Sequence, residues 1–441
     1  MFQRYIFIEE QCYIIVQKGK GMDKYRLISK GLAVGIILLF VGTCFIPVTA
    51  QYIEKPSLLT SSGHWLYVGG KGPGNYTRIQ DAIDNASDGD TVFIFDDSSP
   101  YRETVVIDKT IRLIGENKNT TTIESNKTMH TITISVNQVN ISGFTIRSSS
   151  NIAFIGIYIK SNFSMITGNI ITDNYYNIFL INSSNNNISG NIIENSNTGI
   201  IFINESVKNT ISRNNMLDNN ACIVFTNKTS DNIITGNVLT NNSFGMLFFK
   251  KAQNNRVDGN IITNNNDDSI LFSDSNDNFI SKNIISHNNG NGINLQNSSN
   301  NTISHNRITN NTWCGIYTFG STNNNNIIGN NIDYNTLGGI YVSNGPFNMN
   351  TISGNSFTGN KYAAINLIRS ENNTITYNNF KKNKPNAFFL NSYNNMWNGN
   401  YWDRPRFLPK FIFGYIGIRW ISWINIDWHP AQGPYDIPGI C

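Results

Sequence analysis

Residues 232–262 read NIITGNVLTNNSFGMLFFKKAQNNRVDGNII, and the Gly-Asn pair at 236–237 returns 23 residues later at 259–260. Aligning the phrase Gly-Asn-X-Ile along the chain places one asparagine of each unit, the marker Asn, in a single column. The column contains Asn169, Asn191, Asn214, Asn237, Asn260, Asn283, Asn306, Asn330, Asn355 and Asn378, separated by 22, 23, 23, 23, 23, 23, 24, 25 and 23 residues. A period sustained through most of the chain indicates one repetitive body.

Each unit contains short Ile-rich runs with alternating sides and few strong helix formers, which is typical of strands and turns. Three positions per unit are apolar. The position three residues before the marker holds Ile166, Ile188, Ile211, Ile234, Val257, Ile280, Ile303, Ile327, Ile352 and Ile375. The position two residues after it holds Ile171, Ile193, Met216, Leu239, Ile262, Ile285, Ile308, Ile332, Phe357 and Phe380. The position ten residues after it holds Ile201, Val224, Leu247, Ile270, Ile293, Ile316, Ile340, Ile365 and Phe388.

Three inward-facing strips per unit predict a coil of three short strands, stacked on the next coil at about 4.8 Å. The predicted fold is all-β: a single right-handed parallel β-helix with three-stranded coils of about 23 residues. The crossover rule favours this hand.

A second asparagine column, five residues after the marker, predicts a hydrogen-bonded ladder at a bend, because asparagine tolerates left-handed backbone and can bond to the same amide one coil away. It contains Asn174, Asn219, Asn242, Asn265, Asn288, Asn311, Asn335, Asn360 and Asn383, with Asn195 one place early.

The ends of the repeat define the domain organisation. Residues 1–50 form a leader with an apolar centre from Gly31 to Val48, either a signal peptide or an uncleaved membrane anchor, and translation is expected to start at Met22. Residues 51–90 form a linker and an amphipathic capping helix with Thr77 and Gln80 as a capping box. The β-helix spans 91–402, and an aromatic-rich cap spans 403–441. Both leader readings export the remainder, so we expect a secreted, cell-surface or periplasmic protein.

Composition excludes one class of function. The net charge is +4 and only 14% of residues are charged, while the sequence contains 74 Asn. A protein that binds nucleic acid through a basic surface needs a larger positive charge. We therefore expect no nucleic-acid partner, and contact with a membrane only through an uncleaved leader.

Several phrases resemble a known family. They are Ile79-Gln80-Asp81-Ala82-Ile83 with Gly89-Asp90-Thr91-Val92, then Ile111-Arg112-Leu113-Ile114-Gly115, the repeats, and Gly399-Asn400-Tyr401-Trp402. Together they resemble the NosD-like and pectin-lyase-like right-handed parallel β-helix proteins of exported prokaryotic type. This resemblance implies the fold, and it spans carbohydrate-active enzymes, surface proteins and a periplasmic protein linked to copper delivery.

Candidate metal ligands are sparse. The densest acidic group is Asp267, Asp268, Asp274 and Asp277, a weak candidate for calcium because all four lie within one coil. Charges one unit apart also pair, as in Glu205 with Lys228, Lys251 with Asp274, and Lys208 with Asp231, which favours a role in setting the register between coils. The histidines fall in different columns, so the residues alone favour no copper site, and no cofactor is expected.

One column that alternation directs outward is rich in rings. Its aromatic members, which we predict to bind carbohydrate, are Tyr158, Phe179, Phe202, Phe225, Phe248, Tyr317, Tyr341 and Phe389. Exposed rings offer flat apolar faces to sugars or to a protein partner. The alternative is that the rings stack on one another between coils.

These patterns favour an exported, non-catalytic scaffold or adhesion module that binds polysaccharide, or another surface protein, along the aromatic column. The alternative is a carbohydrate-active enzyme, namely a polysaccharide lyase, hydrolase or epimerase, for which no catalytic residue is identified. A NosD-like copper-handling protein is the third reading.

Overall fold

The structure, a computed structural model, describes residues 63–125, 130–148, 155–417 and 421–437. The expected leader, the start at Met22 and residues 51–62 of the linker lie outside these residues. Within the described part, no helix has the length and apolar character required to cross a bilayer.

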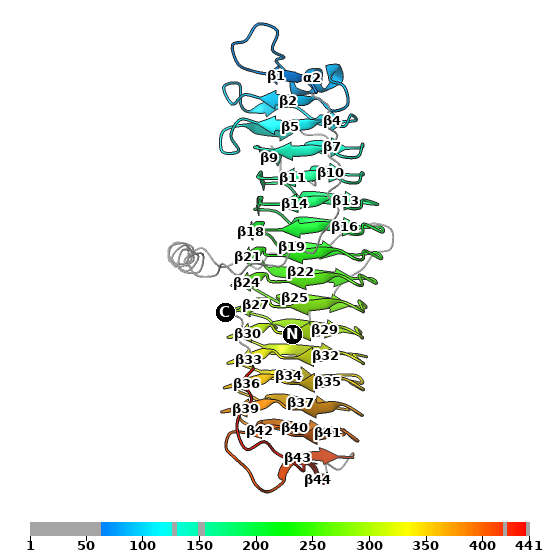
Figure 1. The fold of residues 1–441 in the computed structure, drawn as a ribbon, viewed down its shortest axis with the longest axis vertical. Helices are drawn as coiled ribbons and strands as arrows, with labels where there is room; N and C mark the ends of the chain where they lie inside the picture. The colour runs from blue at the N-terminus through cyan, green and yellow to red at the C-terminus, as the bar shows by residue number, and fades with distance from the viewer. Residues whose placement is uncertain (1–62, 126–129, 149–154, 418–420, 438–441) are drawn as a thin grey trace. The chain divides into compact units, whose positions relative to one another are not determined.

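Successive coils of the described body stack in parallel, and each coil contributes one strand to each of three sheets (Figure 1). Sheet 1 contains β1 (Trp65–Val68), β2 (Thr91–Ile94), β5 (Arg112–Gly115), β8 (Asn140–Ser142), β11 (Met165–Thr167), β14 (Asn187–Ser189), β17 (Thr210–Ser212), β20 (Ile233–Thr235), β23 (Arg256–Asp258), β26 (Phe279–Ser281), β29 (Thr302–Ser304), β32 (Asn326–Ile328), β35 (Thr351–Ser353), β38 (Thr374–Thr376), β41 (Met396–Asn398) and β44 (Ile421–Asp427).

Sheet 2 contains β3 (Tyr101–Arg102), β6 (Thr122–Ser125), β9 (Thr145–Ser148), β12 (Ile170–Thr172), β15 (Ile192–Glu194), β18 (Asn215–Leu217), β21 (Val238–Thr240), β24 (Ile261–Thr263), β27 (Ile284–Ser286), β30 (Arg307–Thr309), β33 (Asn331–Asp333), β36 (Ser356–Thr358), β39 (Asn379–Lys381) and β42 (Tyr401–Trp402).

Sheet 3 contains β4 (Val105–Ile107), β7 (Ile132–Ile134), β10 (Ile155–Ile159), β13 (Tyr176–Ile181), β16 (Thr198–Ile203), β19 (Ala221–Phe225), β22 (Phe244–Phe249), β25 (Ile270–Ser273), β28 (Ile293–Gln296), β31 (Cys314–Phe319), β34 (Gly338–Val342), β37 (Ile365–Ile368), β40 (Ala387–Leu390) and β43 (Lys410–Ile416). The predicted fold class is therefore confirmed.

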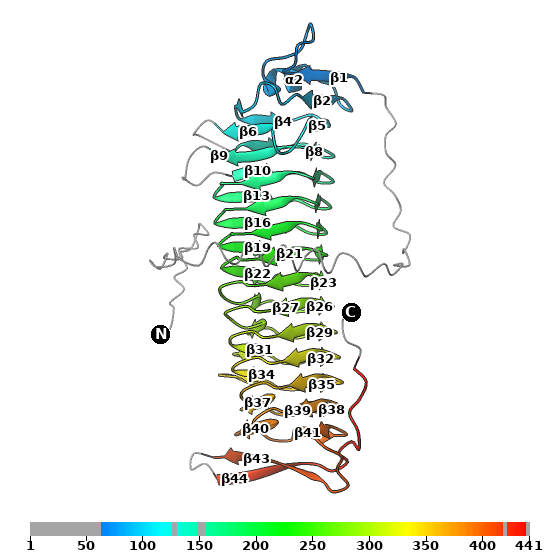
Figure 2. The ribbon, with the colours of Figure 1, turned by 90° about the vertical axis from the view of Figure 1, so that its left-hand side faces the viewer.

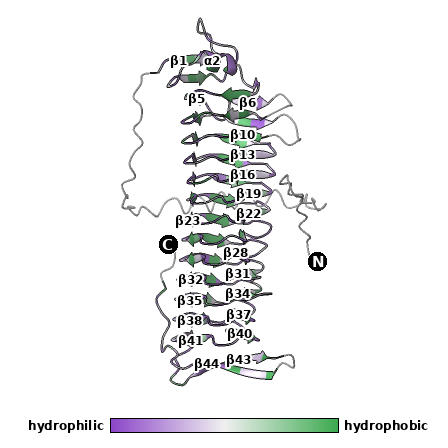
Figure 3. Ribbon diagram, turned by 90° about the vertical axis from the view of Figure 1, so that its right-hand side faces the viewer, coloured by the Kyte–Doolittle hydropathy of each residue, from purple (hydrophilic) through white to green (hydrophobic). Residues whose placement is uncertain are grey.

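The core consists of the aliphatic strips expected from the period. The strips three residues before and two residues after each marker are fully buried, from Ile166 to Ile375 and from Ile171 to Phe380. Figure 3 shows hydrophobic segments on the strands and hydrophilic segments in the connections between them. The third strip is only partly correct, because Ile201, Val224 and Leu247 lie in a different register from Ile270, and Phe388 aligns with Asn366 rather than with the inward Ile365.

Asparagine ladders run along all three corners. At the corner between sheets 1 and 2, the backbone N–H and the Nδ2 of Asn260 both donate to Oδ1 of Asn283, at 2.9 and 3.0 Å. The predicted ladder at the corner between sheets 2 and 3 repeats this geometry, for example from Asn265 to Asn288 at 2.9 Å. The left-handed residue is the one before each ladder position, such as Gly259 and Asn264. This placement corrects the expectation that the ladder asparagines themselves are left-handed.

A third ladder, at the corner between sheets 3 and 1, was not predicted. It contains Asn186, Asn209, Asn232, Asn255, Asn278, Asn301, Asn325, Asn350, Asn373 and Asn395, each five residues before the next marker. Asn195 lies outside the second ladder in a left-handed turn, and Ser196 takes its place by donating to Oδ1 of Asn219 at 2.6 Å.

Helix α2 (Ile79–Asn85) lies at the N-terminal end of the coils beside β1 and buries Ile79, Ala82 and Ile83 (Figure 2). The expected capping box is wrong. The carboxylate of Glu103 accepts the N–H groups of Ile79 and Gln80, at 2.8 and 3.1 Å, so the next coil caps the helix. The first strand, β1, precedes the helix and pairs in parallel with β2, so the strands begin earlier than residue 91.

The antiparallel hairpin β43–β44 covers the last coil. β43 pairs with β40 at Gly414, and β44 meets β41 where Asp427 lies beside Trp397. The buried carboxylate of Asp427 accepts the N–H groups of Gly399 and Asn400, which ends the marker ladder with an acceptor.

Candidate carbohydrate-binding surface

The outer face of sheet 3 carries one continuous column. Strand pairing aligns Tyr158, Phe179, Ile201, Val224, Leu247, Leu271, Asn294, Tyr317, Tyr341, Asn366 and Phe388. Four of the predicted ring residues, Tyr158, Phe179, Tyr317 and Tyr341, belong to this column and are partly exposed.

The other four predicted ring residues are core residues. Phe202, Phe225, Phe248 and Phe389 are fully buried. Phe202 stacks on Phe225, and Phe225 on Phe248, with ring centroids 4.7 Å apart in both pairs. The stack continues to Phe272 at 4.5 Å. The outward placement of these four residues was therefore wrong.

The error has a local cause. The inward-facing Met246 lies four positions after Asn242. Its strand partner Ile270 lies five positions after Asn265, the corresponding asparagine of the next unit. The next corner compensates, because Phe248 precedes Asn255 by seven residues and Phe272 precedes Asn278 by six. The unit therefore keeps its length of 23 residues, although the inward and outward positions of the sheet 3 strand shift by one residue. Because the length is unchanged, the repeat period does not reveal which side chains face the core.

The rings that do face outward form two separated platforms. Tyr158 stacks on Phe179 at 5.7 Å and on His130 at 4.6 Å. Tyr317 and Tyr341 stack at 6.2 Å with an interplanar angle of 11°. Both expectations from sequence thus hold in part, since rings lie on the outer face and also pack on one another.

A buried apolar cluster lies on the same face beside the Tyr158–Phe179 platform. It consists of Ile201, Ala221, Val224, Leu247 and Leu271, each 2–5% exposed, and it is distinct from the main core. Tyr176, Phe179, Ile203, Phe244 and Phe249 pack around it. The outer face of sheet 3 is therefore largely apolar from β13 to β25.

A polar groove runs beside this face, where β13, β16, β19, β22 and β25 end. It has a volume of ≈ 790 Å³ and is lined by Asn182, Asn204, Glu205, Asn227, Lys228, Lys250, Lys251 and Asp274. We call it the corner groove. Sequence reasoning treated Glu205, Lys228, Lys251 and Asp274 only as register pairs. It missed Lys250 and the three asparagines, although Asn182, Asn204 and Lys250 directly follow strands of sheet 3 and Asn227 lies two residues after β19.

Charge pairing in the corner groove is loose. Among the described ion pairs the groove contains Glu205–Lys228, with 4.0 Å between Lys228 Nζ and Glu205 Oε1 and both side chains mostly exposed. The predicted pairs Lys251–Asp274 and Lys208–Asp231 are not among them. Because exposed pairs contribute little free energy, the Glu205–Lys228 pair adds little to stability.

The four aspartates proposed for calcium do not converge. Asp267 and Asp268 precede β25, whereas Asp274 and Asp277 follow it. In the part of the chain that the structure describes, no group of three or more His, Cys, Asp and Glu side chains is arranged to hold a metal ion. The same finding covers the histidine and cysteine ligands of a copper site, but not methionine.

The carboxylate of Asp268 is hydrogen-bonded to two asparagines. Its Oδ1 accepts the N–H and Nδ2 of Asn291, both at 2.8 Å, and its Oδ2 accepts Nδ2 of Asn294 at 2.6 Å. Burial is the main cause that raises the pKa of Asp268. Burial, followed by the charge of Asp268, raises the pKa of Asp267 to about 6.

The two described cysteines contribute no disulfide. Cys222 and Cys314 are free and buried. Burial raises the pKa of both thiols, to about 12 for Cys314, which disfavours the thiolate form that nucleophilic or metal chemistry needs.

Comparison with known families agrees with this geometry. A family model described as "Right handed beta helix region" matches residues 200–349 and 246–403, and one described as "Periplasmic copper-binding protein (NosD)" matches residues 83–266. The chain therefore contains regions that match the right-handed β-helix and NosD family models. The NosD-like, right-handed β-helix resemblance predicted from the sequence is thereby confirmed. No curated protein is significantly similar in sequence to this β-helix protein.

Solved structures share the fold at low identity. The Dettilon tailspike protein is 15% identical with a TM-score of 0.52, covering 74% of this chain and 68% of that chain. The A-module of the Azotobacter vinelandii mannuronan C-5 epimerase AlgE6 is 15% identical with a TM-score of 0.51, covering 74% and 95%. A mutant tailspike protein of the E. coli bacteriophage HK620, in complex with a pentasaccharide, is 12% identical with a TM-score of 0.52, covering 74% and 76%. At these identities the likeness concerns the fold alone.

Proposed function

We propose that this β-helix protein is exported and non-catalytic, and that it binds an extended polysaccharide along the outer face of sheet 3 and the adjoining corner groove. The observation that carries the proposal is the juxtaposition of partly exposed apolar side chains, Phe179, Ile203 and Phe249, with a groove of amide and ammonium groups. Export is supported by the apolar run Gly31–Val48 after Lys24, Arg26 and Lys30.

Sugars match such a surface because they are amphipathic. The C–H faces of a pyranose ring pack on apolar and aromatic side chains, while hydroxyl and carboxylate groups at its edge need polar partners. Along the corner groove, Asn182, Asn204 and Asn227 supply amides in three successive coils, and Lys250 holds the corresponding position in the next. These positions repeat at about 4.8 Å, so an extended chain parallel to the coil axis meets similar chemistry repeatedly.

The charge of the groove favours an acidic polymer. Lys228, Lys250 and Lys251 supply three positive charges, whereas Glu205 and Asp274 supply two negative charges. The excess is small, so we expect modest affinity that decreases with salt concentration. The same surface also suits a protein partner with acidic side chains. In this protein-docking form of the proposal, the β-helix acts as a scaffold.

The test is binding of the full-length protein to a panel of acidic and neutral polysaccharides at two salt concentrations. The variant Lys228→Gln/Lys250→Gln/Lys251→Gln removes the groove cations. The matched control Lys71→Gln/Lys282→Gln/Lys361→Gln removes three exposed lysines elsewhere. We expect binding to an acidic polysaccharide that weakens at least fivefold in the groove variant and stays unchanged in the control. Equal binding by both variants would rule out the groove, and absence of binding to every polymer would favour the protein-docking form.

A carbohydrate-active enzyme is the second candidate, favoured by one observation. Asp267, with a pKa of about 6, lies next to Asp268, which bonds to Asn294 in the outward column beside Tyr317. A carboxyl group that titrates near neutral pH is suited to general acid–base catalysis. Release of shortened or unsaturated sugars in the same binding assay, and its loss in Asp267→Asn, would establish this candidate and overturn the non-catalytic proposal.

A further inference from the structure

The C-terminal hairpin presents an apolar surface that the fold does not use. We define the hairpin surface as the described residues between Arg404 and Trp428. Its exposed large side chains are Phe407, Leu408, Phe411, Phe413, Tyr415, Ile421, Trp423, Ile424 and Trp428. Phe407 is 92% exposed and Phe413 is 64% exposed. Such a concentration of exposed aromatic and aliphatic residues indicates an interaction surface.

Apart from Tyr415, whose ring centroid lies 6.2 Å from that of Phe388, the capping role of the hairpin does not require these side chains. Contact with the last coil is made by Ile412, which is 2% exposed, and by Gly414, whose place against the backbone of Phe389 leaves no room for a side chain. The buried carboxylate of Asp427 fixes the end of β44 to Gly399, Asn400 and Trp402. Ile412, Gly414 and Asp427 therefore anchor the hairpin, while most of its large apolar side chains remain exposed.

The hairpin surface is also basic. Arg404, Arg406 and Lys410 lie within it, and the sequence from Arg404 to Ile426 contains no Asp or Glu. Two acids flank this stretch: Asp403 is exposed and accepts the N–H of Lys382 and Nδ2 of Asn386, whereas Asp427 is fully buried and hydrogen-bonded inward. Burial and the charges of Arg406 and Arg404 lower the pKa of Lys410, which shows that the cations lie close enough to repel one another.

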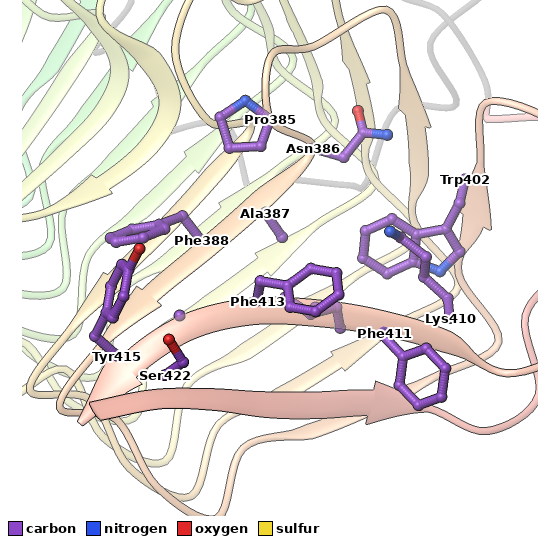
Figure 4. A pocket seen from close by; sticks show the side chains of 12 residues that line it. Pro385, Asn386, Ala387, Phe388, Trp402, Lys410, Phe411, Phe413, Tyr415 and Ser422 are labelled. Atoms are coloured by element: carbon purple, nitrogen blue, oxygen red, sulfur yellow. The ribbon is translucent and has the colours of Figure 1, made fainter. Parts of the chain in front are cut away.

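A pocket under the hairpin combines these features. It has a volume of ≈ 520 Å³, and Figure 4 shows Lys410 beside Trp402, with Phe388 and Tyr415 close together at the opposite end. The Lys410 ammonium lies 5.7 Å from the centroid of the Trp402 ring. Apolar rings and a cation thus meet at the same concave site.

We propose that the hairpin surface docks on a lipid bilayer with anionic headgroups. Tryptophan, tyrosine and phenylalanine with neighbouring lysine and arginine are the side chains that favour the bilayer interface, where rings enter the acyl boundary and cations bind headgroup phosphates. A second copy of this chain fits less well, because apposed hairpin surfaces would bring like charges together. This site is separate from the corner groove and does not depend on the proposed polysaccharide binding.

The test is flotation of the full-length protein with vesicles of phosphatidylcholine, with and without 30 mol% phosphatidylglycerol, about a third anionic lipid. All variants are made in a background with Ile37→Lys and Leu39→Lys, which prevents the apolar leader run from inserting. The hairpin variant is Phe407→Ser/Phe413→Ser/Trp423→Ser. Its matched control is Trp65→Ser/Tyr67→Ser/Phe163→Ser, which removes exposed rings far from the hairpin in sequence.

We expect the background protein and the control to bind anionic vesicles, and the hairpin variant to bind at least tenfold more weakly. A second variant, Arg404→Gln/Arg406→Gln/Lys410→Gln, is expected to lose the preference for anionic over neutral vesicles. Circular dichroism and the thermal midpoint establish that each variant is folded. Equal vesicle binding by the hairpin variant and the control would overturn the proposal, as would hairpin-dependent self-association without vesicle binding.

Discussion

The marker asparagine ladder allows a quantitative prediction at Asn260. This side chain is 1% exposed. Its Oδ1 accepts the N–H and the Nδ2 of Asn237, both at 2.9 Å. Its Nδ2 donates to the carbonyl of Ile234 at 2.9 Å and to Oδ1 of Asn283 at 3.0 Å. One buried amide therefore connects three successive coils.

The substitution Asn260→Ala removes these bonds and leaves the buried N–H of Asn237 without its acceptor. An unsatisfied buried donor costs about 1–3 kcal/mol, and each further lost bond about 0.5–1.5 kcal/mol. Asn237 Nδ2 keeps its bonds to the carbonyls of Ile211 and Thr235, which limits the damage. We therefore expect a loss of about 3 kcal/mol in the free energy of unfolding. The matched control Asn266→Ala, at an exposed position of the next corner, is expected to change stability by less than about 0.5 kcal/mol.

The assay is urea unfolding monitored by circular dichroism, combined with hydrogen exchange of the Asn237 amide. Exchange gives the local effect independently of whether the coils unfold in a single step. The reasoning would be refuted if Asn260→Ala and Asn266→Ala had the same midpoint and the Asn237 amide kept its protection.

Three further predictions concern the core, the hairpin and an acid. Phe225→Ala is expected to lose about 3–5 kcal/mol in urea unfolding because its ring is stacked in the core, whereas Tyr317→Ala on the outer face should lose less than about 1 kcal/mol. Asp427→Ala should increase hydrogen exchange in β43 and β44 while central coils keep their protection, since the substitution removes the acceptor for Gly399, Asn400 and Trp402; uniform protection would contradict this. The raised pKa of Asp267, about 6, means that the folded state binds its proton more tightly than the unfolded state. Stability from this group is therefore complete below about pH 4 and is lost as the pH rises through about 6, and urea midpoints of Asp267→Asn should decline less over this range.

The outward column illustrates where a repeat period misleads. Alternation from the marker correctly directed Tyr317 outward and Ile293 inward. It failed for Phe225 and Val224, because one residue moved from one corner to another without changing the length of the unit. Strand pairing, rather than spacing from a distant marker, determines which face a side chain occupies.

The third asparagine ladder was recoverable from the sequence. In nine of the ten units an asparagine stands five residues before the marker, as Asn255 does before Asn260, and Asn395 stands in the same relation to Asn400. The convergence of Lys250 and Asn227 in the corner groove was harder to foresee. It depends on which turn residues of adjacent coils project to the same side, and this follows from the backbone conformation of each turn.

The sequence by itself determined the coil, its three-sheet division and two of its strips, because stacking identical units repeats a local pattern at every turn of the chain. The three-dimensional arrangement decided which rings are buried and which apolar residues of the hairpin remain exposed. It also decided that Asp427 ends the marker ladder and that Glu103 caps helix α2. These features depend on single residues that meet across coils or at an end, where the repeat no longer supplies an identical neighbour.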